Sequence, residues 1–373
     1  MTFATDQEEL GLLSDSVATL LERAGGRDRA RQARCSDKID RAVWSELAEA
    51  GILGVMAGED TGGLGLGLAA GGVIAMEMGK TLAPDPFAAV TGLTISLFEQ
   101  LAPDHEHLGD IIAGKLVPSF AFQERNSGGL SDNIETVYSK GVLNGAKAWV
   151  ANAEGADFIL VLAKGNEGQV LCLVEPDARG MTTKTIRQSD GSNLSEIVFS
   201  STPGETLVAT LATGPQVDGA VSIATDNAIA LTACELLGVS GAAFELTLEF
   251  LKTREQFGKP IGSFQAIAHR AVDMHTSYQI ADAGIRECLT LMDKTSDTLI
   301  RSRHASRAKV RACETALKIT RDAIQMHGAV GYTDEFDIGL YLNRALALSA
   351  WLGDGAYHRR RWFKLAGIQE KTP

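Results

Sequence analysis

The sequence predicts a multidomain α+β protein in which a β-rich segment separates two helical segments. Apolar residues recur at helical spacing up to about residue 114. Short β-favouring runs separated by glycine fill residues 115–216, and long helical patterns follow. We therefore predict an N-terminal α-helical domain over residues 1–114, a middle β domain over 115–216 and a C-terminal helical bundle over 217–373.

The composition indicates a large acidic protein with a sizeable core. Hydrophobic residues make up 45% of the 373 residues. The formal net charge of −12, from 35 basic and 47 acidic residues, argues against a nucleic-acid partner. No apolar run approaches roughly 18 residues and no signal peptide is visible, so we expect a cytoplasmic protein with no membrane partner. The five cysteines form no Cys-x-x-Cys pair, which argues against a metal site and a disulfide framework.

A glycine cluster over residues 58–67 interrupts the first helical segment. No strand pattern precedes it, as a dinucleotide-binding loop would require, so we interpret it as a surface loop, with a ligand loop as the alternative. In the middle segment, β-favouring runs follow one another without an intervening helix. This arrangement predicts a small antiparallel barrel or sandwich. Its strands are expected near residues 117–122, 134–138, 158–162, 170–174 and 197–199.

The last segment contains four long helical patterns joined by short turns. Such a series predicts an antiparallel four-helix bundle. The expected helices cover residues 223–252, 263–292, 302–326 and 337–352.

The turn between the first two of these helices combines positive charge with an aromatic ring. Residues 254–265 read Arg-Glu-Gln-Phe-Gly-Lys-Pro-Ile-Gly-Ser-Phe-Gln, and their glycines and proline force a tight turn. Arg254 and Lys259 supply the charge, and Phe257 supplies the aromatic face. Such a corner suits the pyrophosphate and a flat ring of a dinucleotide. Arg254 has a second interpretation, as a basic residue that stabilises a helix C-terminus.

A second motif supports the dinucleotide interpretation. Residues 325–332 read Gln-Met-His-Gly-Ala-Val-Gly-Tyr, and Arg344 follows. Together with the turn motif and the helix–β–helix order, this motif resembles the acyl-CoA dehydrogenase family over essentially the whole chain. The resemblance implies an FAD-dependent enzyme of lipid degradation. In such an enzyme a carboxylate removes a proton from Cα of a coenzyme A thioester while the flavin accepts hydride from Cβ. Electron-transferring flavoprotein is the acceptor that the resemblance implies.

In this family each FAD lies between two subunits of a tetramer. The resemblance implies that Arg254 contacts the pyrophosphate of an adjacent subunit's FAD, because a guanidinium fork suits a phosphate pair. Gln325 and Gly328 would meet the adenosine part, with Ala329 replacing a second glycine of the family motif. The implied FAD-binding residues are Arg254, Gln256, Phe257, Gln265, Gln325, Gly328 and Trp149.

The flavin-ring side departs from the family pattern. Trp149 is kept and could shield the ring face, or it is a core aromatic of a strand. The family's threonine at the flavin edge is replaced by Ala151. Residues 123–125 read Gln-Glu-Arg where the family has Thr-Glu-Pro.

The positions expected to carry the catalytic base depart further from the family pattern. The two positions that carry a glutamate in family members are Gly353 and Ala228 in this chain. Asp354 is the nearest carboxylate, but a neighbouring helical position is rotated by about 100°. We favour Asp354 as the N-cap of a helix over residues 355–363 and keep it as a candidate base. The basic run 358–361 is interpreted as a solvated helix face, with contact to the 3′-phosphate of coenzyme A as the alternative.

Two functions fit these residues. The first is a catalytic acyl-CoA dehydrogenase that forms a homotetramer and uses Asp354 or another carboxylate as its base. The second is the partner subunit of an α2β2 heteromeric enzyme, of the kind that acts on steroid side-chain thioesters. That subunit would clasp the FAD of a catalytic subunit and lack a base of its own. A flavin-free thioester-binding protein is a third interpretation.

Overall fold

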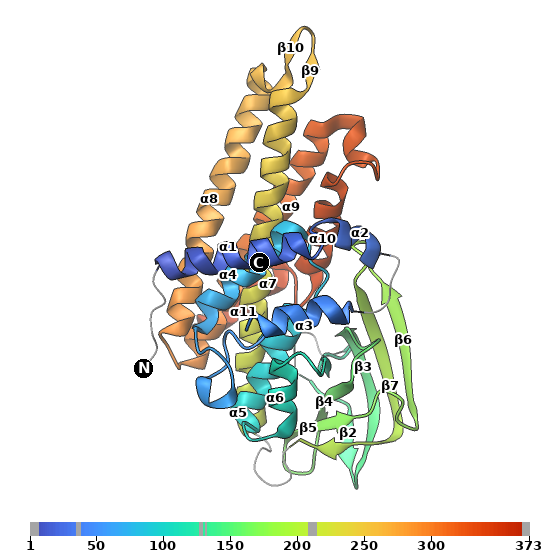
Figure 1. Cartoon of the computed structure of the whole chain (residues 1–373). Coiled ribbons are helices and arrows are strands. Elements are labelled where there is room, and N and C mark those ends of the chain that lie inside the picture. Colours follow the sequence, from blue (N-terminus) through green and yellow to red (C-terminus); the bar gives the residue numbers. More distant parts are fainter. Residues whose placement is uncertain (1–6, 35–38, 127–129, 131–132, 208–214, 368–373) are drawn as a thin grey trace, which may run out of the picture.

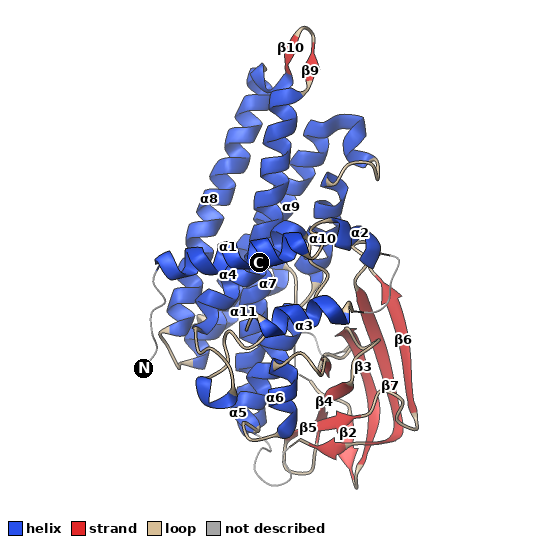
Figure 2. Cartoon of the chain, in the orientation of Figure 1, coloured by secondary structure: helices blue, strands red, loops and turns tan. Residues whose placement is uncertain are grey.

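The computed structural model describes residues 7–34, 39–126, 130, 133–207 and 215–367. Helices form an elongated body, and a sheet lies beside its lower half (Figure 1, Figure 2). Two long helices, α7 (Pro215–Thr253) and α8 (Gln265–Asp293), lead up to a tip formed by β9 (Glu255–Gln256) and β10 (Lys259–Pro260). The tip and the sheet therefore lie at different ends of the chain's long axis.

The N-terminal part is helical, as predicted. Asp40 begins α3 because its carboxylate accepts hydrogen bonds from the amides of Ala42 and Val43. The glycine cluster is a loop, as predicted, with the Glu99 carboxylate accepting a 2.6 Å hydrogen bond from the Gly58 amide. The elements are α1 (Gln7–Arg23), α2 (Asp28–Ala33), α3 (Arg41–Glu49), η1 (Glu59–Thr61), α4 (Gly67–Thr81), the π-helix η2 (Ala88–Ile95), α5 (Ser96–Leu101) and α6 (Glu106–Ile112).

The middle part is β-rich, as predicted for a small antiparallel barrel or sandwich, but its strands form one open sheet that does not close into a barrel. Most of its pairings are antiparallel, as predicted, and two are parallel. The strand order is β6-β7-β3-β2-β4-β5-β8, and β6 and β8 remain as separate edges. Both β1 and β2 run parallel to β4. Whether two strands pair in parallel depends on contacts between distant segments, and the alternation of apolar and polar residues within a strand does not predict those contacts. The strands are β1 (Pro118–Ala121), β2 (Val137–Ser139), β3 (Val142–Ala151), β4 (Phe158–Lys164), β5 (Gln169–Val174), β6 (Met181–Arg187), β7 (Asn193–Pro203) and β8 (Glu205–Thr206).

Strand β4 fixes the sheet to the helices. Its side chains alternate between two cores, because successive residues of a strand point to opposite faces. Leu160 and Leu162 join the core shared with the helices, whereas Ile159 and Val161 join a smaller core within the β part. The sheet is therefore held against the helical body from its centre.

The C-terminal part contains the four predicted bundle helices and the short helix predicted after Asp354. They are α7, α8, α9 (Thr298–His327), α10 (Ile338–Ala350) and α11 (Gly355–Leu365), with η3 (Ile261–Ser263) and η4 (Gly328–Tyr332) between them. Helix α7 is central and packs against α4, α9 and η2. By length and composition α7 alone among the described helices could cross a membrane, but 83% of its apolar window is buried inside the protein. We therefore assign α7 as a core helix.

Candidate functional site

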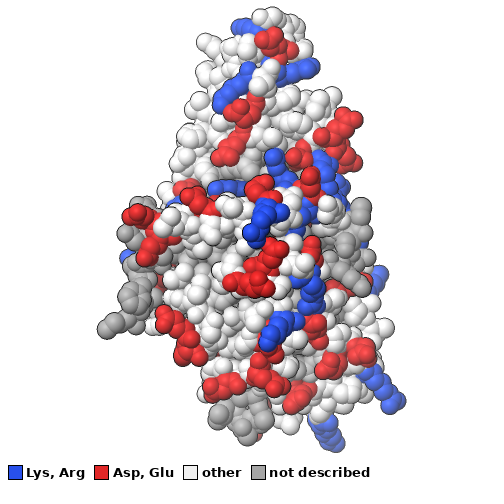
Figure 3. Space-filling model, in the orientation of Figure 1, with Lys and Arg blue, Asp and Glu red and all other residues white. Residues whose placement is uncertain are grey.

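The turn predicted after α7 is a β-hairpin at the tip of the helical body (Figure 1). Phe257 and Gly258 both have positive φ, +55° and +78°, as the two central residues of a type I′ turn require. Phe257 is 91% exposed, and its ring lies edge-on to Phe264 at 6.1 Å. The Lys259 ammonium lies 4.4 Å from the centre of the Phe264 ring. Figure 3 shows basic and acidic side chains close together around this tip, so the hairpin presents aromatic and charged groups away from the rest of the chain.

The second sequence motif lies at the same end of the bundle. The ring of Phe250, one turn before Arg254, stacks on His327 with 4.3 Å between the ring centres. His327 ends α9 and lies between Gln325 and Gly328, both of which are exposed. We call Arg254, Gln256, Phe257, Gln325 and Gly328 the clasp. Gln265, the first residue of α8, is also exposed.

Trp149 lies in the sheet, apart from the clasp. The pairing of β3 with β7 shifts register between Lys147 and Val150, and Trp149 in this irregularity has φ +54° and is 43% exposed. Two residues earlier in β3, buried Lys147 bonds the Glu124 carboxylate at 2.5 Å. Burial alone would raise the pKa of Glu124, but hydrogen bonds from Lys147 and the Glu135 amide bring that pKa below its ordinary value. The pair therefore ties Glu124 to the strand that carries Trp149.

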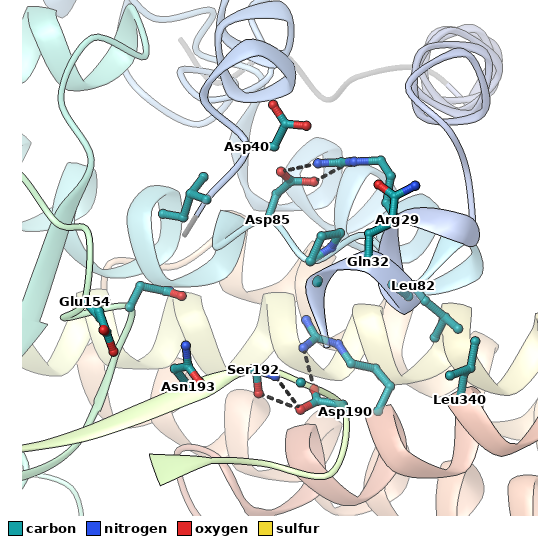
Figure 4. Close-up of a pocket in the computed structure, with 17 residues that line it drawn as sticks. Arg29, Gln32, Asp40, Leu82, Asp85, Glu154, Asp190, Ser192, Asn193 and Leu340 are labelled. Atoms are coloured by element: carbon teal, nitrogen blue, oxygen red, sulfur yellow. Dashed lines mark hydrogen bonds and ion pairs between the residues drawn. The ribbon is translucent and has the colours of Figure 1, made fainter. Parts of the chain in front are cut away.

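Two adjoining cavities open where the three parts of the chain meet. The larger measures about 350 Å³ and the smaller about 70 Å³. They share Asp85, Ser192 and Asn193 among their lining residues (Figure 4), and Arg344 lines both as well. Ala151 and Trp351 both line the smaller cavity, so the residue predicted to face the flavin edge and the loop that leads to Asp354 lie in one cleft.

Ion pairs engage both arginines that line this cleft, Arg29 and Arg344. Arg344 bonds Glu235 through Nε at 2.8 Å and Asp190 through Nη1 at 2.9 Å. Figure 4 shows Arg29 and Asp85 paired on the opposite wall, with nitrogen–oxygen distances of 2.9 and 2.8 Å. Burial raises the pKa of Glu235, and Arg344 opposes that shift. The Arg344 contacts join α7 and α10 to the loop before β7, and the Arg29–Asp85 pair joins α2 to the segment between α4 and η2.

The loop that follows α10 is fixed from several sides. The buried Lys309 ammonium bonds the carbonyl oxygens of Leu348 at 2.6 Å and Trp351 at 2.8 Å. His358 Nε2 lies 2.9 Å from the carbonyl oxygen of Leu352. Gly353 has φ +97°, and a Cβ at this residue would lie 2.5 Å from the Tyr357 ring. The backbone of residues 351–354 therefore has little freedom to move.

Comparison with known proteins agrees with this architecture. Models of the acyl-CoA dehydrogenase N-terminal, middle and C-terminal domains match residues 7–102, 119–202 and 224–364. The chain belongs to the acyl-CoA dehydrogenase family. It is 28% identical to acyl-CoA dehydrogenase IpdE2 of Mycolicibacterium smegmatis over 95% of this chain and 97% of that protein. It is also 28% identical to mitochondrial isovaleryl-CoA dehydrogenase of Solanum tuberosum, over 83% of this chain and 80% of that protein.

Two solved structures share the whole fold. A variant of the Tcur3481-Tcur3483 steroid ACAD has a TM-score of 0.85 and 27% identity, covering 96% of this chain and 98% of that one. The ChsE4-ChsE5 complex from Mycobacterium tuberculosis has a TM-score of 0.85 at 22% identity, covering all of both chains, and shows the fold alone.

In this acyl-CoA dehydrogenase family member, neighbouring groups pack closely around Gly353 and Ala228, the two residues at which the resemblance implies a glutamate. Gly353 is constrained as described above. Ala228 is fully buried, and a Cβ on Gly92 of η2 would lie 2.8 Å from the Ala228 Cα. Asp354 is exposed and caps α11, with its Oδ1 2.7 Å from the Tyr357 amide, so the predicted N-cap is confirmed.

The basic run 358–361 differs from the predicted solvated face. His358 is buried, and Arg361 reaches inward to Asp226 at 2.7 Å. Arg359 pairs with Glu314 on α9 at the surface. The run mainly fastens α11 to the bundle. The Arg361–Asp226 ion pair could not be predicted from the sequence because the two residues are 135 positions apart in the chain.

Proposed function

We propose that this chain is a subunit of an FAD-dependent acyl-CoA dehydrogenase, which forms a double bond between Cα and Cβ of a coenzyme A thioester in fatty-acid or steroid side-chain catabolism. The observation that carries the proposal is the separation of the clasp from Trp149. The hairpin of the clasp lies at the tip of the helical body, whereas Trp149 belongs to β3 of the sheet, so within one chain they suit two different flavins (Figure 1). An extended FAD that crosses a subunit boundary would meet the clasp of one chain and the sheet of another.

The exposed groups of the clasp fit a dinucleotide. Arg254 offers a guanidinium fork for a pyrophosphate, and Phe257 offers a ring face for the adenine. Gly328 has no side chain to hold the nucleotide away from the backbone. When bound, FAD would supply hydride acceptance, and Trp149 would cover one face of its ring. Electron-transferring flavoprotein would then accept the electrons, and we place the assembly in the cytoplasm.

A second candidate function is the partner subunit of a heteromeric α2β2 enzyme. Three observations favour it: Gly353 stands where a base is customary, Ala228 is closed in by η2, and Asp354 is engaged as a helix cap. In such an assembly the catalytic subunit would supply the carboxylate, and this chain would supply the clasp. Removing a positioned base costs about 10²–10⁴-fold in rate, so a chain lacking one would depend on its partner.

Production of the chain alone, and together with a second dehydrogenase-like chain encoded beside it, separates these functions. The measurements are visible flavin absorbance, subunit mass and acyl-CoA turnover. Full FAD occupancy with turnover from this chain alone would exclude the partner-subunit function. One FAD per pair of unlike chains, with none bound by this chain alone, would exclude the homotetramer. Absence of flavin under both conditions would favour a flavin-free thioester-binding protein.

A further inference from the structure

Three aromatic rings join the two halves of the clasp. Phe250 lies on α7, one turn before Arg254. His327 ends α9, and Phe336 follows η4. The His327 ring stacks on Phe250 with 4.3 Å between the ring centres and an interplanar angle of 26°, and its centre lies 4.8 Å from that of Phe336. Phe250 and Phe336 also meet edge-on at 6.0 Å. We call these three residues the aromatic triad.

His327 is the most closely held member of the triad. It is 4% exposed, whereas Phe250 and Phe336 are half-buried. Its Nδ1 lies 2.7 Å from the carbonyl oxygen of Ala323, one turn earlier in α9. A Cβ on Gly331 would lie 3.1 Å from the His327 Cβ, so η4 packs directly over the end of α9. The ring therefore has little room to leave the stack.

The His327 ring acts through its shape and not through charge. Nδ1 faces a carbonyl oxygen and so carries the proton, which leaves Nε2 as an acceptor. Among the described residues, Nε2 has no hydrogen-bond partner. Burial lowers the pKa of His327, so the ring is uncharged at pH 7. A neutral ring between two phenylalanines contributes mainly by stacking.

The triad lies where both arms of the clasp begin. One arm is the hairpin after α7, which carries Arg254, and the other consists of Gln325 and Gly328 on either side of His327. Helix α8 and most of α9 separate the two arms in the sequence. Their spacing therefore depends on contacts across the bundle, and the stack of Phe250 on His327 is such a contact.

We propose that His327 is a positioning residue for the cofactor. Its ring sets the spacing between the arm that meets the pyrophosphate and the arm that meets the adenosine part of a neighbouring subunit's FAD. A dinucleotide that bridges both arms binds more tightly when they are already held in place, because less ordering is needed on binding. The inference rests on the proposed function, since it needs FAD at the clasp. It assigns a role to a residue that need not touch the FAD.

The test measures the dissociation constant for FAD of the assembled complex, from the flavin that is retained at a series of dilutions. We expect His327→Ala to raise this constant about tenfold, because the two arms are no longer preorganised. His327→Phe keeps a flat ring in the stack and should stay within about threefold of the parent. His107→Ala is the matched control, since it removes a histidine ring 5.1 Å from Phe158 on α6, far from the hairpin in Figure 1. It should leave FAD binding unchanged.

A double-mutant cycle with Arg254→Ala separates positioning from general stability. A stability effect of His327→Ala would weaken FAD binding by the same factor with or without Arg254. Positioning instead predicts that Arg254→Ala costs less in the His327→Ala complex than in the parent, because a misplaced arm has less binding to lose. Thermal unfolding of each complex records stability alongside. If His327→Ala does not fold, Phe250→Leu takes its place, since leucine keeps apolar volume and removes the flat ring.

Equal FAD affinity of the His327→Ala and parent complexes would overturn the inference. So would strictly additive effects of His327→Ala and Arg254→Ala, because His327 would then serve the fold and not the spacing of the arms. A His327→Phe complex as weak as His327→Ala would also overturn it, since the stacked ring would not be what holds the arms. A parent complex that contains no flavin and takes up none would reject the proposed function itself. The flavin content of the parent complex thus distinguishes the two failures.

Discussion

Asp354 Oδ1 accepts a hydrogen bond of 2.7 Å from the Tyr357 amide and so caps the first turn of α11. Asparagine is as good an N-cap as aspartate, whereas alanine loses about 1 kcal/mol. We therefore expect Asp354→Asn to leave both melting temperature and turnover of the assembled enzyme nearly unchanged, and Asp354→Ala to lower only the melting temperature. Steady-state turnover and thermal unfolding check both variants. A large loss of turnover in Asp354→Asn, without loss of stability, would instead make Asp354 a catalytic residue.

Gly353 cannot be converted into a working base by one substitution. A side chain at φ +97° is strained, at a cost of roughly 1–2 kcal/mol, and its Cβ would press against Tyr357. Gly353→Glu should therefore lower the melting temperature and give no gain in turnover. Gly353→Ala is the matched control, since it introduces the same backbone strain without a carboxylate. Turnover that rises in Gly353→Glu but not in Gly353→Ala would show that the loop accommodates a base.

Arg254 should contribute to cofactor retention and little to folding. Its side chain is exposed at the end of α7, so Arg254→Ala should leave the isolated chain within about 0.5 kcal/mol of the parent in free energy of unfolding. The assembled complex should lose FAD during gel filtration, and Arg254→Lys should lose less, because lysine keeps the charge but not the fork. Lys252→Ala, two residues earlier and also exposed, is the control. If the Arg254→Ala and Lys252→Ala complexes retain FAD equally well, Arg254 does not contribute to FAD binding.

Lys147 and Glu124 should behave as a coupled buried pair. Removing one partner leaves an uncompensated buried charge, which costs about 3–5 kcal/mol, whereas replacing both costs less. Lys147→Met should therefore be strongly destabilising, and Lys147→Met with Glu124→Gln should recover part of the loss. Chemical denaturation of the two single variants and the double variant measures the coupling energy. Strictly additive effects would show that the two side chains do not stabilise the fold as a pair.

Local chemistry along the chain accounts for the features that the sequence predicts well. The turn at Phe257–Gly258, the Asp354 cap and the long helices all depend on neighbours within a few residues. The clasp needed the additional motif at Gln325, and the structure brings the two motifs to one end of the bundle.

The features that sequence reasoning missed depend on partners far along the chain. In the sequence Arg344 is only the residue that trails the second motif, yet it bonds Glu235, 109 residues away, and Asp190, 154 residues away. Lys309 resembles any basic residue of a helix, but it is buried and holds the carbonyl oxygens after α10. The open sheet was missed for the same reason, because β1 pairs with β4 across the whole of β2 and β3. The periodicity of apolar residues predicts which face of a helix or strand is buried, but it does not predict which other segment packs against that face.

His358 should make the stability of the bundle sensitive to acid. Burial, with nearby Lys309, lowers its pKa from 6.5 to about 3 in the folded protein. Between those two values the unfolded chain binds a proton that the folded chain does not, so this group's contribution to stability is present above about pH 6.5 and is lost as the pH falls toward 3. For one such group, the free energy of unfolding changes by at most about 1.4 kcal/mol per pH unit.

The variant His358→Gln can still donate a hydrogen bond to the Leu352 carbonyl oxygen, but it does not titrate. The free energy of unfolding, measured by denaturation at pH values from 7 to 4, should therefore decrease less steeply with falling pH for this variant than for the parent protein. Parallel pH profiles for the two proteins would mean that His358 is not the group that titrates, and the acid sensitivity would then have to come from other groups whose pKa is lowered by burial, such as His327.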